Sequence, residues 1–400
     1  MGHHHNGKSS LIPLIDRLNK YPIGLVDSDK LRQILALLFS EEEAFVASRF
    51  PLEEATLPEL AKRTGLPVAK LAVILEKMAV KGLVMDMPCE GTTYYLLMPG
   101  LIGFFEFTFM KQRADLPLVE LAKLMREYLE ESQAPEFFGS KTQLTRSLIY
   151  EEHVPVTSAV TSYEQAREII ANAGYGAVGL CYCRHKKEHE EKVCGKGAPV
   201  EEICISLGNA ARFMVRRGFA SERTSDELLV VLARARSFNL THITDNIRHK
   251  PSFICNCCRC CCELLAGVQM GYVDGIAKTG FSVAIDAENC SGCGLCYTAC
   301  NVQALGMASG ERTARLNKEL CLGCGACISV CPKGALKMLA LAKRPLPPHK
   351  RKDLFVKMLR EKRRFTPYLL LALRQSMRNL FAKEKKVICR SSSQSGRSQR

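Results

Sequence analysis

The sequence lacks any long apolar run. No stretch of its 400 residues reaches the ~18 consecutive apolar residues that a membrane-spanning helix needs. The opening residues, Met-Gly-His-His-His-Asn-Gly-Lys, also lack the apolar core of a secretion signal. We therefore expect a cytoplasmic protein. A G-x-G-x-x-G sequence following a strand is missing as well, so no flavin or nicotinamide site is predicted.

A phosphate-binding loop is excluded although its letters are present. Residues Gly2 to Ser9 satisfy G-x4-G-K-[ST], a motif that needs a preceding strand and a following helix. Only Met1 precedes it, so the sequence predicts a flexible terminus there.

Basic charge is concentrated at the C-terminal end. Residues 341–400 hold 18 Lys and Arg against 3 acids, which equals the net charge of +15 for the whole chain. Two basic amphipathic helices are predicted, at 351–365 and 368–386, followed by a disordered end. Such helices suit an anionic membrane surface or an acidic redox partner, or they pack against the body of the protein.

The 20 cysteines decide the class of protein. In a reducing compartment, thiols in such numbers predict metal ligands rather than disulfides. Eight of them form two C-x2-C-x2-C-x3-C runs offset by 31 residues, the first starting at Cys290 and the second at Cys321. This spacing is typical of iron–sulfur clusters, whereas zinc sites use paired C-x2-C or Cys/His sets.

These two runs resemble the bacterial two-[4Fe-4S] ferredoxin domain. The resemblance implies two [4Fe-4S] clusters and crossed ligation, in which the last cysteine of each run joins the first three of the other. One set is then Cys290, Cys293, Cys296 and Cys331, and the other is Cys300, Cys321, Cys324 and Cys327. The chain departs from the pattern once: Pro332 follows Cys331, but Asn301 follows Cys300. We expect this to affect local rigidity rather than cluster binding.

Ten further cysteines form a second field. They are Cys181, Cys183, Cys194, Cys204, Cys255, Cys257, Cys258, Cys260, Cys261 and Cys262. Adjacent cysteines point in different directions, so these thiols cannot all hold one small cage. Either the first four hold one cluster and four of the later run another, or the two runs share ligands. We expect room for one or two more iron–sulfur clusters, with zinc as the alternative.

The whole of residues 150–340 is similar to the 4Fe-4S dicluster ferredoxin-type proteins of anaerobic bacteria, through C-Y-C-R-H-K, I-C-N-C-C-R-C-C-C and the repeat. The similarity implies no particular reaction. Arg184, Lys186 and Arg259 stand beside the thiols, where positive charge would raise a cluster's potential. A solvated basic turn is the plainer interpretation.

Residues 29–110 have the pattern of a winged helix-turn-helix. We predict helices over 29–48, 58–63 and 67–81, then a two-stranded wing over 83–87 and 93–98. Thr56 is the predicted cap of the second helix, and Gly65 and Gly82 end the second and third. Acidic residues accompany the lysines and no Arg-rich face is present, so DNA contact is the weaker interpretation and a packing module the stronger.

The predicted fold is α+β in six segments. They are a flexible N-terminus 1–28, a winged-helix-like domain 29–112, a helical connector 113–155, a cysteine-rich module 156–275, a dicluster ferredoxin domain 276–341 and a basic helical tail 342–400. The predicted function is electron transfer with redox partner proteins. The alternatives are a redox-responsive, DNA-binding regulator and an iron–sulfur enzyme that uses the middle cysteines.

Overall fold

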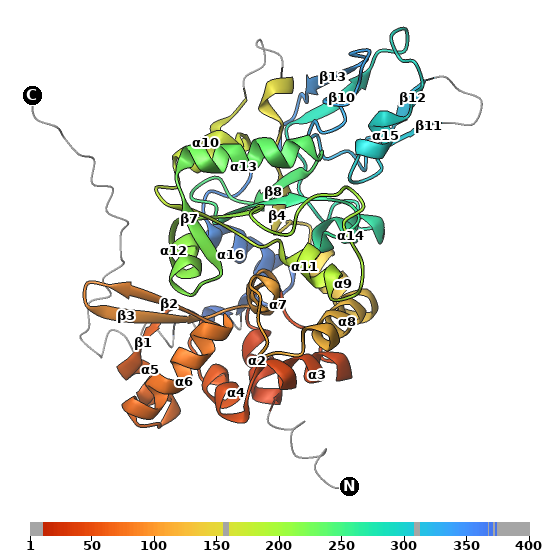
Figure 1. Cartoon of the computed structure of the whole chain (residues 1–400). Helices are drawn as coiled ribbons and strands as arrows, with labels where there is room; N and C mark the ends of the chain where they lie inside the picture. The colour runs from red at the N-terminus through yellow and green to blue at the C-terminus, as the bar shows by residue number, and fades with distance from the viewer. Residues whose placement is uncertain (1–10, 155–159, 308–312, 367, 371–372, 374–400) are drawn as a thin grey trace, which may run out of the picture.

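A computed structural model describes residues 11–154, 160–307, 313–366, 368–370 and 373 (Figure 1). Helices and strands are mixed along these residues, as the sequence predicts for an α+β protein. The phosphate-loop pattern at 2–9, most of the second tail helix at 368–386 and the polar end lie outside the described residues. Among the described residues, no helix has the length and apolarity that crossing a bilayer requires.

The N-terminal lobe alternates helices with a small antiparallel sheet of order β1-β3-β2. Its elements are α2 (Ile12–Leu18), α3 (Asp29–Leu38), α4 (Glu41–Ser48), β1 (Ala55–Thr56), α5 (Leu57–Thr64), α6 (Val68–Lys81), β2 (Val84–Cys89) and β3 (Thr92–Leu97). The capping box of Thr56 with Glu59 and the left-handed Gly65 and Gly82 delimit α5 and α6, as predicted.

Two expectations for this lobe are wrong. The helix predicted over 29–48 is two helices, because the Ser40 side chain caps Glu43 in a capping box and so starts α4 afresh. The segment 1–28 is not flexible throughout: Leu14 and Leu18 of α2 are buried, and the Arg17 Nε donates to the Phe50 carbonyl at 2.7 Å. Residues 11–28 therefore belong to the folded lobe.

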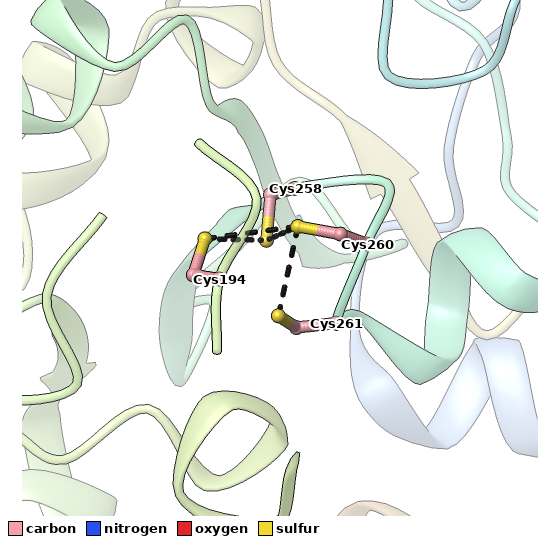
Figure 2. Close-up of side chains that lie close together, drawn as sticks. All are labelled: Cys194, Cys258, Cys260 and Cys261. Atoms are coloured by element: carbon pink, nitrogen blue, oxygen red, sulfur yellow. Dashed lines mark hydrogen bonds between the residues drawn. The ribbon is translucent and has the colours of Figure 1, made fainter. Parts of the chain in front are cut away.

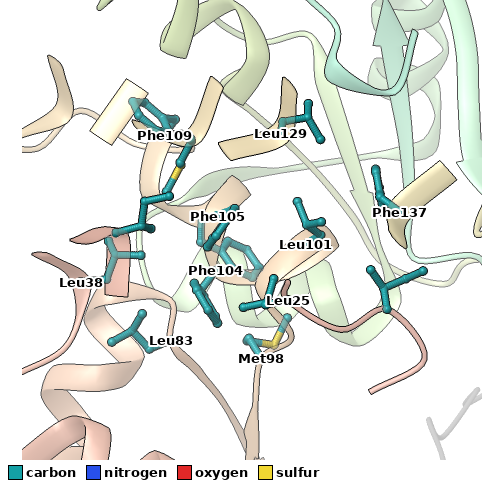
Figure 3. Close-up of a cluster of buried hydrophobic side chains, with 14 of the residues drawn as sticks. Leu25, Leu38, Leu83, Met98, Leu101, Phe104, Phe105, Phe109, Leu129 and Phe137 are labelled. Carbon is teal, nitrogen blue, oxygen red and sulfur yellow. The ribbon is translucent and has the colours of Figure 1, made fainter. Parts of the chain in front are cut away.

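Phenylalanines join this lobe to the rest of the chain. The joining elements are η1 (Gly100–Phe104), α7 (Phe105–Phe109), α8 (Leu118–Tyr128), η2 (Leu129–Gln133) and α9 (Ala134–Phe138). Figure 3 shows Phe104 and Phe105 gathered between Leu38, Leu83 and Leu101. The same buried cluster continues to thiols of the middle field and to Leu322 of the repeat, so the predicted segments share one core.

The middle of the molecule is a six-stranded antiparallel sheet of order β4-β8-β9-β6-β5-β7. Its strands are β4 (Thr145–Ser147), β5 (Gly176–Gly179), β6 (Cys204–Leu207), β7 (Ala220–Arg223), β8 (Thr241–Asp245) and β9 (Phe253–Cys257). The edge strand β4 comes from the segment predicted as a helical connector. Short 3-10 turns, η3 (Glu151–His153) and η4 (Ser162–Glu164), follow it.

Two kinds of side chain occupy the two faces of this sheet. Apolar residues of β5, β6 and β9 pack against α10 (Ala166–Ala171) and α13 (Ser225–Ser237), which lie together over one face (Figure 1). Side chains alternate along a strand, so Cys255 and Cys257 point away from Ile254 and that helical layer. The remaining helices of this region are α11 (Tyr182–Glu188), α12 (Gly208–Arg216) and α14 (Glu263–Gln269).

The cysteine repeat lies at the end of the molecule away from the N-terminal lobe (Figure 1). It consists of two antiparallel strand pairs and a short helix. The pairs are β10 (Phe281–Ile285) with β13 (Leu336–Ala340) and β11 (Leu305–Met307) with β12 (Ala314–Leu316), and the helix is α15 (Leu295–Ala299).

The chain then returns to the body as α16 (Arg351–Glu361), the first of the two predicted tail helices. Leu354, Met358 and Leu359 are buried, and Glu361 accepts hydrogen bonds from Thr142. This helix therefore packs against the protein.

Candidate metal centres

The eight repeat cysteines fall into two groups of four. Cys290, Cys293, Cys296 and Cys331 line one small pocket. In the other group, burial raises the pKa of Cys327, and the neighbouring thiols Cys324, Cys300 and Cys321 raise it further. Both groups combine the two runs of the repeat, which is the crossed arrangement that the ferredoxin resemblance implies.

Each half repeats the backbone geometry of the other. The Ala304 N–H donates to the Cys300 Sγ at 3.2 Å, and the Ala335 N–H donates to the Cys331 Sγ at 3.3 Å. These pairs differ by the same 31 residues as the cysteine runs. At Gly323, φ is +67°, and a Cβ there would lie 2.2 Å from the Phe281 carbonyl oxygen, so the turn requires glycine. Hydrogen bonds to ligand sulfurs are the usual means by which a protein tunes a cluster.

Asn301, the departure from the ferredoxin pattern, is buried at the junction with the middle sheet. Its Nδ2 donates to the Asn239 carbonyl at 2.7 Å and to the Thr241 Oγ1 at 3.0 Å, and its Oδ1 accepts from the Arg259 N–H at 3.3 Å. A proline could make none of these bonds. The asparagine thus anchors the repeat to the middle module.

Six of the middle thiols form a closed ring. In order around the ring they are Cys181, Cys183, Cys262, Cys257, Cys255 and Cys204, and each interacts with the thiol before it and the thiol after it. All six line one cavity of about 20 Å³. We call this set the six-thiol ring. Five members are buried and Cys255 is partly exposed.

The sheet assembles this ring. Ile205 pairs with Ile254 in the antiparallel register of β6 and β9, which places Cys204 opposite Cys255. Cys257 follows two residues later on the same face, and Cys183 and Cys262 approach from α11 and the residue before α14. Residues distant in sequence therefore converge through strand register.

The other four middle cysteines form a separate, tighter group (Figure 2). Cys194 Sγ lies 3.6 Å from Cys258 Sγ and 3.7 Å from Cys260 Sγ. Cys260 Sγ lies 3.4 Å from Cys258 Sγ and 3.6 Å from Cys261 Sγ. We call this set the four-thiol group. The ten thiols thus divide six and four, and both sets draw on both cysteine runs, as one of the two alternatives expected.

Arg184 lies between the ring and the four-thiol group. It is buried, and its Nη2 donates to the Asn256 carbonyl at 3.0 Å. Burial lowers the pKa of its guanidinium, but thiols from both sets outweigh this and the net shift is upward. Its Nε and Nη1 find no hydrogen-bond partner among the described residues. A solvated basic turn is therefore the wrong interpretation for this residue, because the cation faces the thiols.

Lys196 lies between the four-thiol group and the repeat. Its Nζ donates to the Asn239 carbonyl at 3.1 Å and to the Ala299 carbonyl, directly before Cys300, at 2.9 Å. Burial lowers its pKa, while thiols on both sides, Cys258 and Cys300 among them, oppose that shift. The sequence gave no warning of this position, since Lys196 stands in an ordinary Gly-Lys-Gly turn.

Further buried polar groups surround the ring. Burial raises the pKa of Glu106 to about 7 and lowers that of Lys186, paired with Glu263, to about 8. The neutral His242, whose pKa burial lowers to about 4, bonds Asn256 Oδ1 at 2.5 Å. Asn256 Nδ2 in turn donates to the Ile203 carbonyl at 2.6 Å, which fixes the residue between Cys255 and Cys257. Sequence reasoning identified only Lys186, as a neighbouring charge.

The comparisons with known proteins bear on the repeat alone. No curated protein and no solved structure matches the chain. Residues 283–338 match the family model of the 4Fe-4S dicluster domain. This segment contains all eight repeat cysteines, so the chain carries an iron–sulfur, ferredoxin-like domain.

Proposed function

We propose that this protein transfers electrons between the dicluster repeat and the middle module. The two groups of four repeat cysteines would each hold a [4Fe-4S] cluster, and the six-thiol ring would hold a further iron–sulfur cluster. Bound clusters of this kind supply one-electron chemistry. Cys293 is exposed and Cys327 is buried, so the two groups form an outer and an inner site.

A single strand residue carries this proposal. The Thr241 hydroxyl donates to the Cys324 Sγ of the inner site at 3.8 Å. On the sheet, Thr241 is also the direct cross-strand partner of Cys257, a member of the ring. Cross-strand neighbours have Cβ atoms about 5 Å apart on the same face. The inner site and the ring are therefore separated by little more than one residue.

The ring suits a cluster of several metals. Its thiols lie on three separate parts of the chain and surround a cavity, and no three of them are among the closely grouped sulfurs found in the described residues. A single tetrahedral ion would need four sulfurs in mutual contact. Arg184, Lys186 and the thiol-facing N–H groups supply the positive charge that an anionic cluster needs.

Metal analysis of the anaerobically purified full chain tests the proposal. Two cubanes alone give about eight iron and eight sulfide per chain, and an occupied ring raises both. Cys262→Ser should lower iron and sulfide without changing the repeat's EPR signals, whereas Cys293→Ser should change those signals. A wild-type chain with eight iron and no extra sulfide would refute the ring cluster, and one without sulfide would refute the whole proposal.

We infer that residues 41–97 form a winged-helix module that serves as a docking lobe. The order α4-β1-α5-α6-β2-β3 supports this inference. Arg217, after α12, contacts Glu76 of α6 at 2.5 Å and Asp86 of β2 at 3.0 Å. The helix and wing that would face DNA thus contact the middle module, which favours docking over a DNA-binding regulator.

A further inference from the structure

The four-thiol group differs in size from the repeat sites. Its four sulfur atoms all lie within 4.8 Å of one another, and four of the Sγ–Sγ distances are between 3.4 and 3.7 Å. Within the described residues this is the only cysteine set so close, and all eight repeat cysteines belong to those residues. Two different spacings of thiols therefore occur in one molecule.

Elementary geometry connects each spacing with a kind of centre. In a cubane every thiolate binds a different iron, so the iron–sulfur core holds the four thiolates apart. One tetrahedral ion draws its four thiolates together: a metal–sulfur bond of about 2.3 Å gives sulfur–sulfur edges of about 3.8 Å. The distances in the four-thiol group are those of the single ion. The repeat sites are too open for it.

The chain is folded to hold these four sulfurs from two sides. Cys194 comes from a turn in which the Gly197 φ is +64°, while Cys258, Cys260 and Cys261 come from the turn after β9 (Figure 2). A Cβ on Gly195 would already lie 3.8 Å from the Cys260 Cβ. The two turns are thus in van der Waals contact around the sulfurs.

Fixed charge supports a bound ion. A divalent ion with four thiolates is anionic, and two buried cations stand beside this group. Arg184 has two guanidinium nitrogens without a partner among the described residues, and its interactions include Cys194 and Cys258. Lys196 approaches from the side of the repeat. Leaving such buried donors unpaired would be costly, so an anionic centre explains their placement.

We propose that Cys194, Cys258, Cys260 and Cys261 bind one tetrahedral ion, zinc or a single iron, and not an iron–sulfur cluster. The ion joins the turn that carries Lys196 to the turn that follows β9, and so fixes the junction between the ring and the repeat. This site is independent of the proposed electron transfer, because its ligands belong neither to the ring nor to the repeat.

X-ray absorption and metal analysis of the native, anaerobically purified chain test the proposal without any substitution. We expect one zinc per chain with four sulfur ligands at about 2.3 Å and no metal neighbour. If the ion is iron, the oxidised protein shows instead the EPR signal of one isolated ferric ion, which supports the same site. A chain with neither zinc nor an isolated iron overturns it.

Two adjacent cysteines provide a matched pair. Cys261→Ser should lose the single ion and keep the iron and sulfide of wild type, whereas Cys262→Ser should keep that ion. Loss of several iron and sulfide together on Cys261→Ser would show that the four-thiol group holds a cluster. An unchanged zinc content in Cys261→Ser would show that zinc binds elsewhere. The failure of the ring cluster would appear only in Cys262→Ser, so the two proposals fail separately.

Discussion

At the residue scale, hydrogen-bond direction at Thr241 follows from its neighbours. Asn301 Nδ2 can only donate, so the Thr241 oxygen accepts that bond at 3.0 Å and its own hydrogen points elsewhere. The Cys324 Sγ at 3.8 Å is the acceptor available to it. An asparagine in place of the usual proline thus orients a hydroxyl toward a ligand sulfur.

Thr241→Val removes that donor at nearly constant volume. A hydrogen bond to the thiolate stabilises the reduced, more negative cluster, so its loss should lower the reduction potential of the inner site. A bond worth 0.5–1.5 kcal/mol corresponds to about 20–60 mV for one electron. EPR-monitored redox titration resolves the two repeat signals.

Thr244→Val is the matched control for this change. Thr244 is a buried threonine of the same strand, but its hydroxyl donates to the Phe253 carbonyl at 2.5 Å. This variant should leave both potentials in place. An equal shift in both variants would mean that general loosening of β8, and not the sulfur bond, sets the potential.

Glu106 should make stability depend on pH. Burial raises its pKa from 4.5 to about 7, so between these values the folded chain holds a proton that the unfolded chain has lost. Stability is unaffected below pH 4.5 and falls as the pH rises to 7, by about 3 kcal/mol.

Glu106→Gln should remove this dependence and leave a flatter profile of thermal midpoint against pH between 5 and 8. Glutamine keeps an acceptor for the Gly103 N–H, which now donates to Glu106 Oε2 at 2.7 Å. Glu120→Gln, at an exposed position of α8, should leave the wild-type profile. A profile of Glu106→Gln that still falls toward pH 7 would contradict the burial argument.

At the scale of elements, caps explain which boundaries the sequence could predict. Thr56, Gly65 and Gly82 act through contacts within a few residues, so α5 and α6 were predicted nearly to their ends. Ser40 offered the same kind of signal, followed by Glu43 three positions later, but the apolar periodicity on both sides masked it. Local hydrogen bonds outweighed periodicity there.

Glu136 holds the end of α16 against the body. It accepts from Lys362 at 2.8 Å, Arg364 at 2.7 Å and the Gly24 N–H at 2.9 Å. Glu136→Ala leaves Lys362, itself largely buried, without its carboxylate, which costs about 1–3 kcal/mol. We expect faster trypsin cleavage after Lys362 and Arg363 in the native protein.

Glu130→Ala serves as the control, because its ion pair with Arg126 is a more exposed i,i+4 pair of little energetic weight. Its cleavage pattern should be that of wild type. If Glu136→Ala is cleaved no faster, the buried apolar side chains of α16 alone hold the tail in place.

At the scale of the molecule, the range of the encoding contacts separates what could be predicted from what could not. The repeat keeps its ligands within each run and its offset partner, so spacing alone indicated the residues. The middle thiols are sorted by strand register and by turns more than 60 residues apart, such as Cys194 with Cys258. Arg184 and Lys196 acquire their roles only once those segments meet.

The distribution of charge and the docked lobe together predict how the whole protein meets DNA. Residues 1–340 carry no net charge, and the wing contacts α12, so any DNA binding should be nonspecific and due to the tail. Replacing Arg374, Arg378, Lys383, Lys385 and Lys386 by Gln should abolish it, whereas Lys70→Gln with Lys77→Gln on α6 should not. Fluorescence anisotropy at two salt concentrations measures both, because each lost phosphate contact lowers the salt slope by about one. Binding that survives the tail substitutions and is lost with the two α6 lysines would establish α6 as a DNA-reading helix and overturn the docking role.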